Sequence, residues 1–164
     1  MVSPTVAQLK DVKLLQKFTE SELAELIQVG QTGGYEAHSN IVIEGEMSWG
    51  LFLILQGVVG IFKTNKLTGD ICDIGSLRAG SFFGEMSLID NNPRSATVKA
   101  LGDCQVFYIS KEAFMSFLDR SPDLKFRFYE NCIRDLIGRL RELGDSYVVS
   151  QYQLWKTAIR KEAS

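Results

Sequence analysis

The chain has 164 residues, of which 45% are hydrophobic and 23% charged, proportions typical of a globular domain with a buried core. Its formal net charge of −2 argues against a surface that neutralises a phosphate backbone, so no nucleic acid is expected as a partner. The longest apolar run, 50–62, is interrupted by Gln56, Gly57 and Gly60, and no segment approaches the ~20 apolar residues that cross a bilayer. The sequence begins without a secretory signal, so we expect a cytoplasmic protein that does not contact membranes.

The first predicted element is a short helix that ends near Val29. Thr19 and Glu22 have the spacing of a capping box, and leucine and isoleucine then recur at helical intervals. We place an N-terminal helical segment at 8–30.

The segment 34–110 has the pattern of short β-strands. Residues 50–62 are expected to form two strands hinged at Gln56 and Gly57, and Gly69 with Asp70 marks a hairpin turn. Alternating apolar residues follow Arg94. Strands at such regular spacing predict an antiparallel β roll or jelly roll.

Helices are predicted for 111–162. Ser110 and Ser121 are helix-capping residues, and Pro122 suits the first helical position. Apolar residues then repeat every seven positions, at Ile133, Leu140, Tyr147 and Leu154. We expect a long helix that self-associates. In the alternative, the helix breaks at Gly138 or Gly144 and folds back on the roll.

Four arginines on this helix, Arg127, Arg134, Arg139 and Arg141, are balanced by nearby carboxylates. This balance predicts a solvated helix face rather than a DNA-binding patch.

The segment 83–98 combines residues suited to a ligand. Gly84 lets a ligand approach the backbone where the chain enters a short helix, and Arg94 offers a planar fork of donors for a phosphate or carboxylate. Glu85 would repel a phosphate at contact, so it is expected to accept a hydrogen bond from a hydroxyl group or to hold Arg94. Ser95 adds a hydroxyl group beside Arg94. The alternative is a structural ion pair between Glu85 and Arg94.

The run 83–98 closely resembles the phosphate-binding cassette of cyclic nucleotide-binding domains, with Gly84, Glu85 and Arg94 in the family's order and spacing. The resemblance extends over nearly the whole chain, with Gly45 and Gly57 at the family's usual turns. It is similar to the sensor domains of catabolite activator-like proteins without their DNA-binding domain. The implied fold is α+β: an antiparallel β roll or jelly roll with an N-terminal helical segment and a long C-terminal helix that serves as lid and dimerisation helix, within a single domain over 1–164.

The resemblance implies that Glu85 binds the ribose 2′-hydroxyl and Arg94 the cyclic phosphate. Ser95 occupies a position where a hydroxyl group also reaches guanine, so cAMP and cGMP both remain open. The backbone N–H groups that would complete the phosphate cradle belong to Gly84, Met86, Ser87 and Ala96. The side chains considered for covering the base are Arg134, Arg139 and Leu140.

Other functions are less favoured by the sequence. A metal-dependent enzyme on a jelly roll needs several converging ligands, whereas His38 is the single histidine and Cys72, Cys104 and Cys132 lack metal-site spacing. We therefore expect no catalysis, no metal and no cofactor besides the nucleotide.

Resemblance to a kinase regulatory subunit would call for an Arg-Arg-x-Ser/Ala segment and a second tandem domain, neither of which occurs here. We expect a stand-alone, homodimeric sensor with an unidentified downstream protein partner. Three alternatives stay open: a sensor fragment of a catabolite activator-like transcription regulator, a scaffold that has lost nucleotide binding, and a gating domain excised from a membrane channel.

Overall fold

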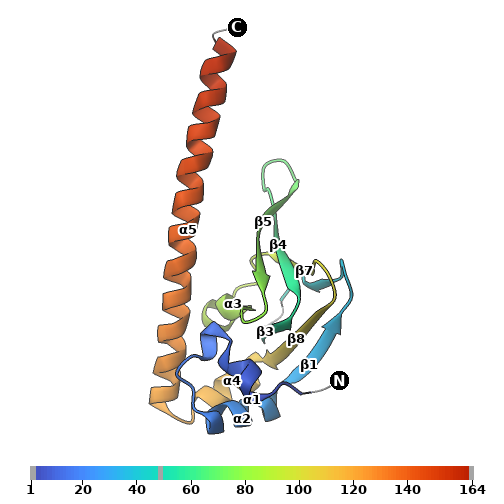
Figure 1. Cartoon of the computed structure of the whole chain (residues 1–164), viewed down its shortest axis with the longest axis vertical. Helices are drawn as coiled ribbons and strands as arrows, with labels where there is room; N and C mark the ends of the chain where they lie inside the picture. The colour runs from blue at the N-terminus through green and yellow to red at the C-terminus, as the bar shows by residue number, and fades with distance from the viewer. Residues whose placement is uncertain (1–2, 48–49, 163–164) are drawn as a thin grey trace. The chain divides into compact units, whose positions relative to one another are not determined.

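The computed structural model describes residues 3–47 and 50–162 (Figure 1). The chain divides into two compact units, Met1–Asn131 and Cys132–Ser164. The first unit contains every strand that the structure describes.

Within the described residues, the strands form two four-stranded antiparallel sheets (Figure 1). The first sheet has the order β1 (Gln31–Tyr35), β8 (Cys104–Ser110), β3 (Gly50–Gln56) and β6 (Phe82–Phe83). The second has the order β2 (Asn40–Val42), β7 (Thr97–Ala100), β4 (Val58–Thr64) and β5 (Ile71–Arg78). This arrangement confirms the predicted antiparallel β roll.

The core of the roll is a cluster of buried apolar residues from both sheets. Phe52 and Phe83 stack within it, with ring centroids 4.8 Å apart. The cluster consists of Val42, Phe52, Ile54, Val59, Phe83, Val98, Ala100, Cys104 and Val106. Alternation along β7, where Val98 and Ala100 are buried, follows the pattern that the sequence predicts.

Gly57 is the point where the chain passes from one sheet to the other. Its φ is +92°, and a Cβ atom there would lie 2.7 Å from the Asp103 carbonyl oxygen. The predicted hinge between two strands is confirmed, and β3 and β4 belong to different sheets. The hairpin between β4 and β5 is also confirmed: the Asn65 N–H donates to the Asp70 carbonyl oxygen at 2.8 Å.

The N-terminal helical elements are α1 (Val6–Lys10), a 3₁₀ turn at Lys13–Leu15, and α2 (Glu20–Val29). The predicted capping box of α2 is present, since the Thr19 hydroxyl accepts from the Glu22 N–H and the Glu22 carboxylate accepts from the Thr19 N–H. Thr5 and Gln8 form a second capping box that the sequence analysis missed, although Thr-x-x-Gln is a known form of the motif.

Two further helices follow the roll. Helix α4 (Lys111–Leu118) begins at Ser110, whose hydroxyl accepts from the Ala113 N–H. Helix α5 runs over Pro122–Glu162 without a break at Gly138 or Gly144, so the two-segment alternative is wrong. The cost of two helical glycines, about 1 kcal/mol each, is too small to end a 41-residue helix.

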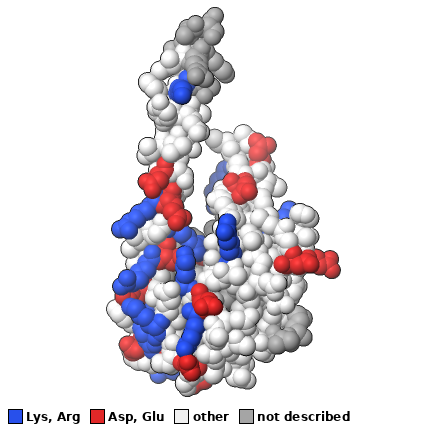
Figure 2. All heavy atoms as spheres, in the orientation of Figure 1, with Lys and Arg blue, Asp and Glu red and all other residues white. Residues whose placement is uncertain are grey.

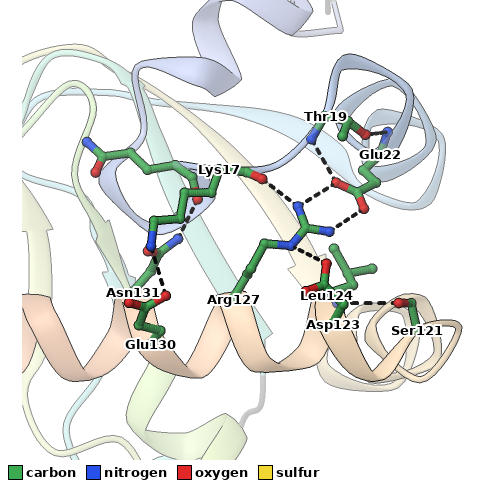
Figure 3. A network of polar contacts seen from close by, with 10 residues as sticks. Lys17, Thr19, Glu22, Ser121, Asp123, Leu124, Arg127, Glu130 and Asn131 are labelled. Atoms are coloured by element: carbon green, nitrogen blue, oxygen red, sulfur yellow. Dashed lines mark hydrogen bonds and ion pairs between the residues drawn. The ribbon is translucent and has the colours of Figure 1, made fainter.

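Arg127 ties the first turns of α5 to the N-terminal segment (Figure 3). Its Nη2 lies 2.6 Å from Glu22 Oε1 and its Nη1 3.0 Å from Glu22 Oε2, a bidentate pair. It also donates to the Lys17 carbonyl oxygen and pairs with Asp123. Only 15% of its side chain is exposed, so the expectation of a solvated face is wrong for Arg127.

Two contacts beside Arg127 strengthen the same junction. The Asn131 amide donates to the carbonyl oxygens of Leu14 and Gln16 at 2.9 and 2.6 Å. Lys17 pairs with Glu130 at 2.9 Å (Figure 3). Within the first unit, the start of α5 is therefore held against the N-terminal helical segment by side-chain bonds from two of its turns.

Charge is distributed differently along the two units. On the face shown in Figure 2, positive and negative side chains are interspersed over the first unit. Within the second unit, the run 146–155 contains no charged residue, and its described large apolar side chains are 56–67% exposed in the single chain.

Candidate functional site

The predicted cassette forms a short helix and a loop within the first unit. Helix α3 (Glu85–Asp90) follows β6 directly, and the loop 91–96 leads into β7. The helix after Gly84 that the sequence predicts is thus present.

Gly84 is required by the close approach of two other groups. It precedes α3 with a φ of +89°, in the left-handed region. A Cβ atom there would lie 2.4 Å from the Gly50 carbonyl oxygen and 2.6 Å from Arg94 Nη1. A side chain at this position would therefore displace the guanidinium group or the first residue of β3, Gly50.

Arg94 is buried, with only 4% of its surface exposed. Its Nη1 and Nη2 both lie 3.3 Å from the Gly50 carbonyl oxygen, and its guanidinium carbon lies 5.2 Å from the centre of the Phe52 ring. Its backbone is held from both directions: the N–H donates to Glu46 O at 3.0 Å, and the carbonyl accepts from Gly45 N–H at 2.9 Å. The position of the Arg94 backbone, from which the guanidinium group extends, is therefore fixed.

The surroundings of Arg94 combine burial with nearby acidic groups. Burial lowers the pKa of Arg94, while the nearby Tyr108, Glu85 and Glu46 act in the opposite direction. Glu85 is itself only 3% exposed. A buried guanidinium group has lost much of its hydration, and bidentate bonds from an oxyanion replace that loss well.

The other predicted cassette residues surround this pair. Ser87 is buried in α3, whereas Met86 is 47% exposed. The Ser95 side chain is exposed, and its hydroxyl lies 3.8 Å from Met86 Sδ. Ala96 is half-buried immediately before β7. The structure thus brings Gly84, Met86, Arg94 and Ser95 together across the cassette.

The three residues considered for covering the base belong to the second unit. Arg139 pairs with Asp135 of the same helix at 2.6 Å, and Leu140 is 68% exposed. Arg134 also lies on this helix, with an exposed side chain. Their contact with a base stays a prediction.

A separate cavity of about 300 Å³ lies outside the cassette. Two of its lining residues, Glu36 and Asp103, carry carboxylates, which disfavour a phosphate. The remaining lining residues are Gly34, Tyr35, Gln56, Cys104 and Gln105.

Over 3–47 and 50–162, no cluster of three or more His, Cys, Asp or Glu side chains could hold a metal ion. In the same ranges, no helix is long and apolar enough to cross a membrane.

Comparison with known families decides the assignment. The family model described as cyclic nucleotide-binding domain matches residues 34–121, more than half of the chain. The chain belongs to the cyclic nucleotide-binding domain family. The matched range contains both sheets from Gly34 onward and the entire cassette.

Known relatives come from regulatory proteins. A cAMP-dependent protein kinase regulatory subunit of Debaryomyces hansenii is 32% identical over 116 residues, which cover 71% of this chain and 25% of the relative. The chain therefore spans about a quarter of the length of the curated relatives it matches. The inhibitory segment and second tandem domain expected of a kinase regulatory subunit do not occur in this sequence, so the similarity concerns one part of such proteins.

Solved structures support the same fold. A cyclic nucleotide-binding domain from Methylobacillus flagellatus has a TM-score of 0.73 and 29% identity, with 84% of this chain and 76% of that chain covered. The catabolite activator protein of Thermus thermophilus has a TM-score of 0.69 and 28% identity, with 79% and 59% covered. The predicted resemblance to catabolite activator-like sensor domains is confirmed.

Sequence reasoning missed the residues that hold the backbone around Arg94. The hydrogen bonds from Gly45 and to Glu46 link positions that are about 50 residues apart, and Lys63 donates to the Ser95 carbonyl oxygen at 2.7 Å. The family resemblance implies a turn at Gly45, but no local pattern signals its contact with Arg94.

Proposed function

We propose that this chain is a cyclic nucleotide-binding regulatory protein in which Arg94 binds the cyclic phosphate. The observation that carries the proposal is the buried guanidinium group of Arg94, fixed against Gly50 and adjoining Gly84 in a cassette of this family. Backbone N–H groups of Gly84, Met86, Ser87 and Ala96 complete the phosphate site, as the family resemblance implies.

Glu85 is assigned to the ribose 2′-hydroxyl. Its carboxylate is buried beside Arg94 and can accept a hydrogen bond from a hydroxyl group of the ligand. The related kinase subunits are named for cAMP, which makes cAMP the first ligand to test. The second ligand to test is cGMP, because the family resemblance places the Ser95 hydroxyl within reach of guanine.

The proposed output is a change in helix α5, with no catalysis by this chain. Nucleotide binding would alter the surface of α5 and so its fit to a downstream protein, and Arg134, Arg139 and Leu140 stay the candidates for base contact. Such a shift is limited by the difference in nucleotide affinity between the two states of the helix.

Self-association through α5 is part of the proposal. The seven-residue repeat at Ile133, Leu140, Tyr147 and Leu154 consists of side chains that are 56–68% exposed in the single chain. Apolar side chains repeated every seven residues favour pairing with a second helix.

Replacing Arg94 tests the assignment. In calorimetric titrations with cAMP and cGMP, Arg94→Ala is expected to weaken binding by about 1.5–3 kcal/mol, because a charge-assisted bidentate contact is lost. Arg78→Ala is the matched control, since Arg78 ends β5 with an exposed side chain. Thermal unfolding of both variants confirms that they are folded.

Full-strength binding by folded Arg94→Ala would contradict the assignment. A parallel variant, Glu85→Gln, is expected to weaken binding and leave the fold intact. If Glu85→Gln instead unfolds the protein, the carboxylate serves as a structural partner of Arg94.

A further inference from the structure

Lys63 stands out among the side chains that the proposed function leaves unused. It lies near the end of β4, and its ammonium group donates to the backbone carbonyl of Ser95 at 2.7 Å. Ser95 directly follows Arg94 in the proposed binding site, so Lys63 connects a strand of the roll to that site.

The ladder between β4 and β7 explains why a side chain is needed here. Its last register pair is Phe62 with Thr97, so the next residues of the cassette lie beyond the ladder. Past that point β4 continues to pair with β5. The Lys63 side chain therefore supplies to Ser95 a hydrogen bond that the backbone ladder no longer supplies.

Glu44 holds Lys63 and the start of β7 in the same arrangement. Its carboxylate lies 4.0 Å from the Lys63 ammonium and accepts from the Thr64 N–H at 2.8 Å. Its own N–H donates to Thr97 Oγ1 at 3.0 Å. The hydrogen bond from Thr64 is the main cause that lowers the pKa of Glu44, so this partner stays charged near neutral pH.

The Ser95 hydroxyl has little else to orient it. The Ser95 hydroxyl lies 3.8 Å from the thioether sulfur of Met86, a weak acceptor, and the Ser95 side chain is exposed. The backbone of Arg94, by contrast, is fixed through Gly45 and Glu46. The placement of the hydroxyl thus depends on how the Ser95 carbonyl is held.

We infer that Lys63 is a positioning residue that orients Ser95 and thereby sets the discrimination between cyclic nucleotides. This inference rests on the proposed function. Lys63 acts on the ligand through the Ser95 backbone and hydroxyl, and loss of its ammonium group is expected to affect cAMP and cGMP unequally.

The test is a double-mutant cycle on the full chain, with dissociation constants for cAMP and cGMP measured by calorimetry. Ser95→Ala is expected to raise the dissociation constant of the nucleotide that the Ser95 hydroxyl contacts by roughly three- to tenfold. Lys63→Met, which keeps the apolar stem, is expected to change the cGMP-to-cAMP ratio of dissociation constants in the same direction. In the Ser95→Ala background, adding Lys63→Met should produce no further change in the ratio of dissociation constants.

Two control variants separate positioning from charge. Lys66→Met removes a positive charge from the same hairpin and is expected to leave the ratio unchanged. Lys63→Arg keeps a donor for the Ser95 carbonyl and is expected to restore the wild-type ratio.

Each outcome has one meaning. A ratio that Lys63→Met leaves unchanged, or that it shifts equally with and without Ser95→Ala, overturns the inference while the proposed function stands. Failure of the wild-type chain to bind either nucleotide overturns the proposed function, and the inference with it. A shift in the ratio that disappears in the Ser95→Ala background supports both.

Discussion

The position of the Arg94 guanidinium group requires a residue without a side chain at position 84. The guanidinium group reaches the Gly50 carbonyl because no side chain stands at Gly84, where a Cβ atom would lie 2.6 Å from Arg94 Nη1. In the sequence alone, Gly84 looks interchangeable with any other glycine at the start of a helix or turn. Its essential feature here is the contact with an arginine ten positions later.

Gly84→Ala is expected to destabilise the folded protein by about 2–4 kcal/mol, since backbone strain adds to the collision with Gly50 and Arg94. Gly45→Ala is the matched control: Gly45 has a similar φ of +84°, but a Cβ atom there meets nothing within 4 Å. Its expected loss is about 1–2 kcal/mol, from backbone strain alone. Denaturant unfolding of both variants measures the difference, and equal losses would contradict the role assigned to this close approach.

The cassette is visible in the sequence because its key residues are close together in the chain. Gly84, Glu85 and Arg94 lie within eleven positions of one another, and their order alone indicates a family. The partners that fix them are distant: Gly50 lies 44 positions from Arg94, and Lys63 lies 32 from Ser95. Contacts of this kind follow from the sheet register, which no single segment encodes.

At the scale of helices and strands, the elements with capping motifs were the most predictable. Ser110 and Ser121 begin α4 and α5 because each hydroxyl group accepts from the N–H three residues ahead. The assignment of β3 and β4 to different sheets was not predictable, because both strands read as similar apolar runs. The pairing of α2 with α5 was hidden as well, since Glu22 and Arg127 lie 105 positions apart.

The junction between α2 and α5 should depend on Arg127 more than its surface charge suggests. Arg127→Met is expected to lower the free energy of unfolding by about 1–3 kcal/mol, because it leaves Glu22 without its bidentate partner and the Lys17 carbonyl without a donor. The ion pair between Arg127 and Glu22 is partly shielded from water, since only 15 and 23% of the two side chains are exposed.

Arg120→Met is the control for this prediction. Arg120, in the turn between α4 and α5, also pairs with a carboxylate of α2, Glu25, but both side chains are more than half exposed. Screening by water limits its expected cost to less than about 1 kcal/mol. Equal losses in urea unfolding of the two variants would argue against a special role for Arg127.

At the scale of the whole molecule, the second unit exposes many apolar side chains to water when the chain is alone. Its uncharged run 146–155 exposes Tyr147, Val148, Tyr152, Leu154 and Trp155. A helix that is apolar around much of its circumference is ordinarily buried by a partner. The heptad pattern was visible in the sequence, whereas the continuity of α5 through Gly138 and Gly144 required the structure.

Light scattering after size-exclusion chromatography is expected to give twice the chain mass of 18.4 kDa. Tyr147→Glu, on the seven-residue repeat, is expected to return the protein to monomer, because a charge enters the apolar seam. Val149→Glu places the same charge on an apolar position of the opposite side and should leave the dimer intact. A wild-type protein that runs as a monomer would contradict self-association through α5.

The central claim is that this chain binds a cyclic nucleotide at the Arg94 cassette. Calorimetric titration of the wild-type protein with cAMP and, separately, with cGMP tests it most directly. Saturable binding of at least one nucleotide, with one site per chain, is the predicted result. An absence of binding heat for both nucleotides, confirmed by an unchanged unfolding temperature in their presence, would contradict the claim and favour a scaffold that has kept only the fold.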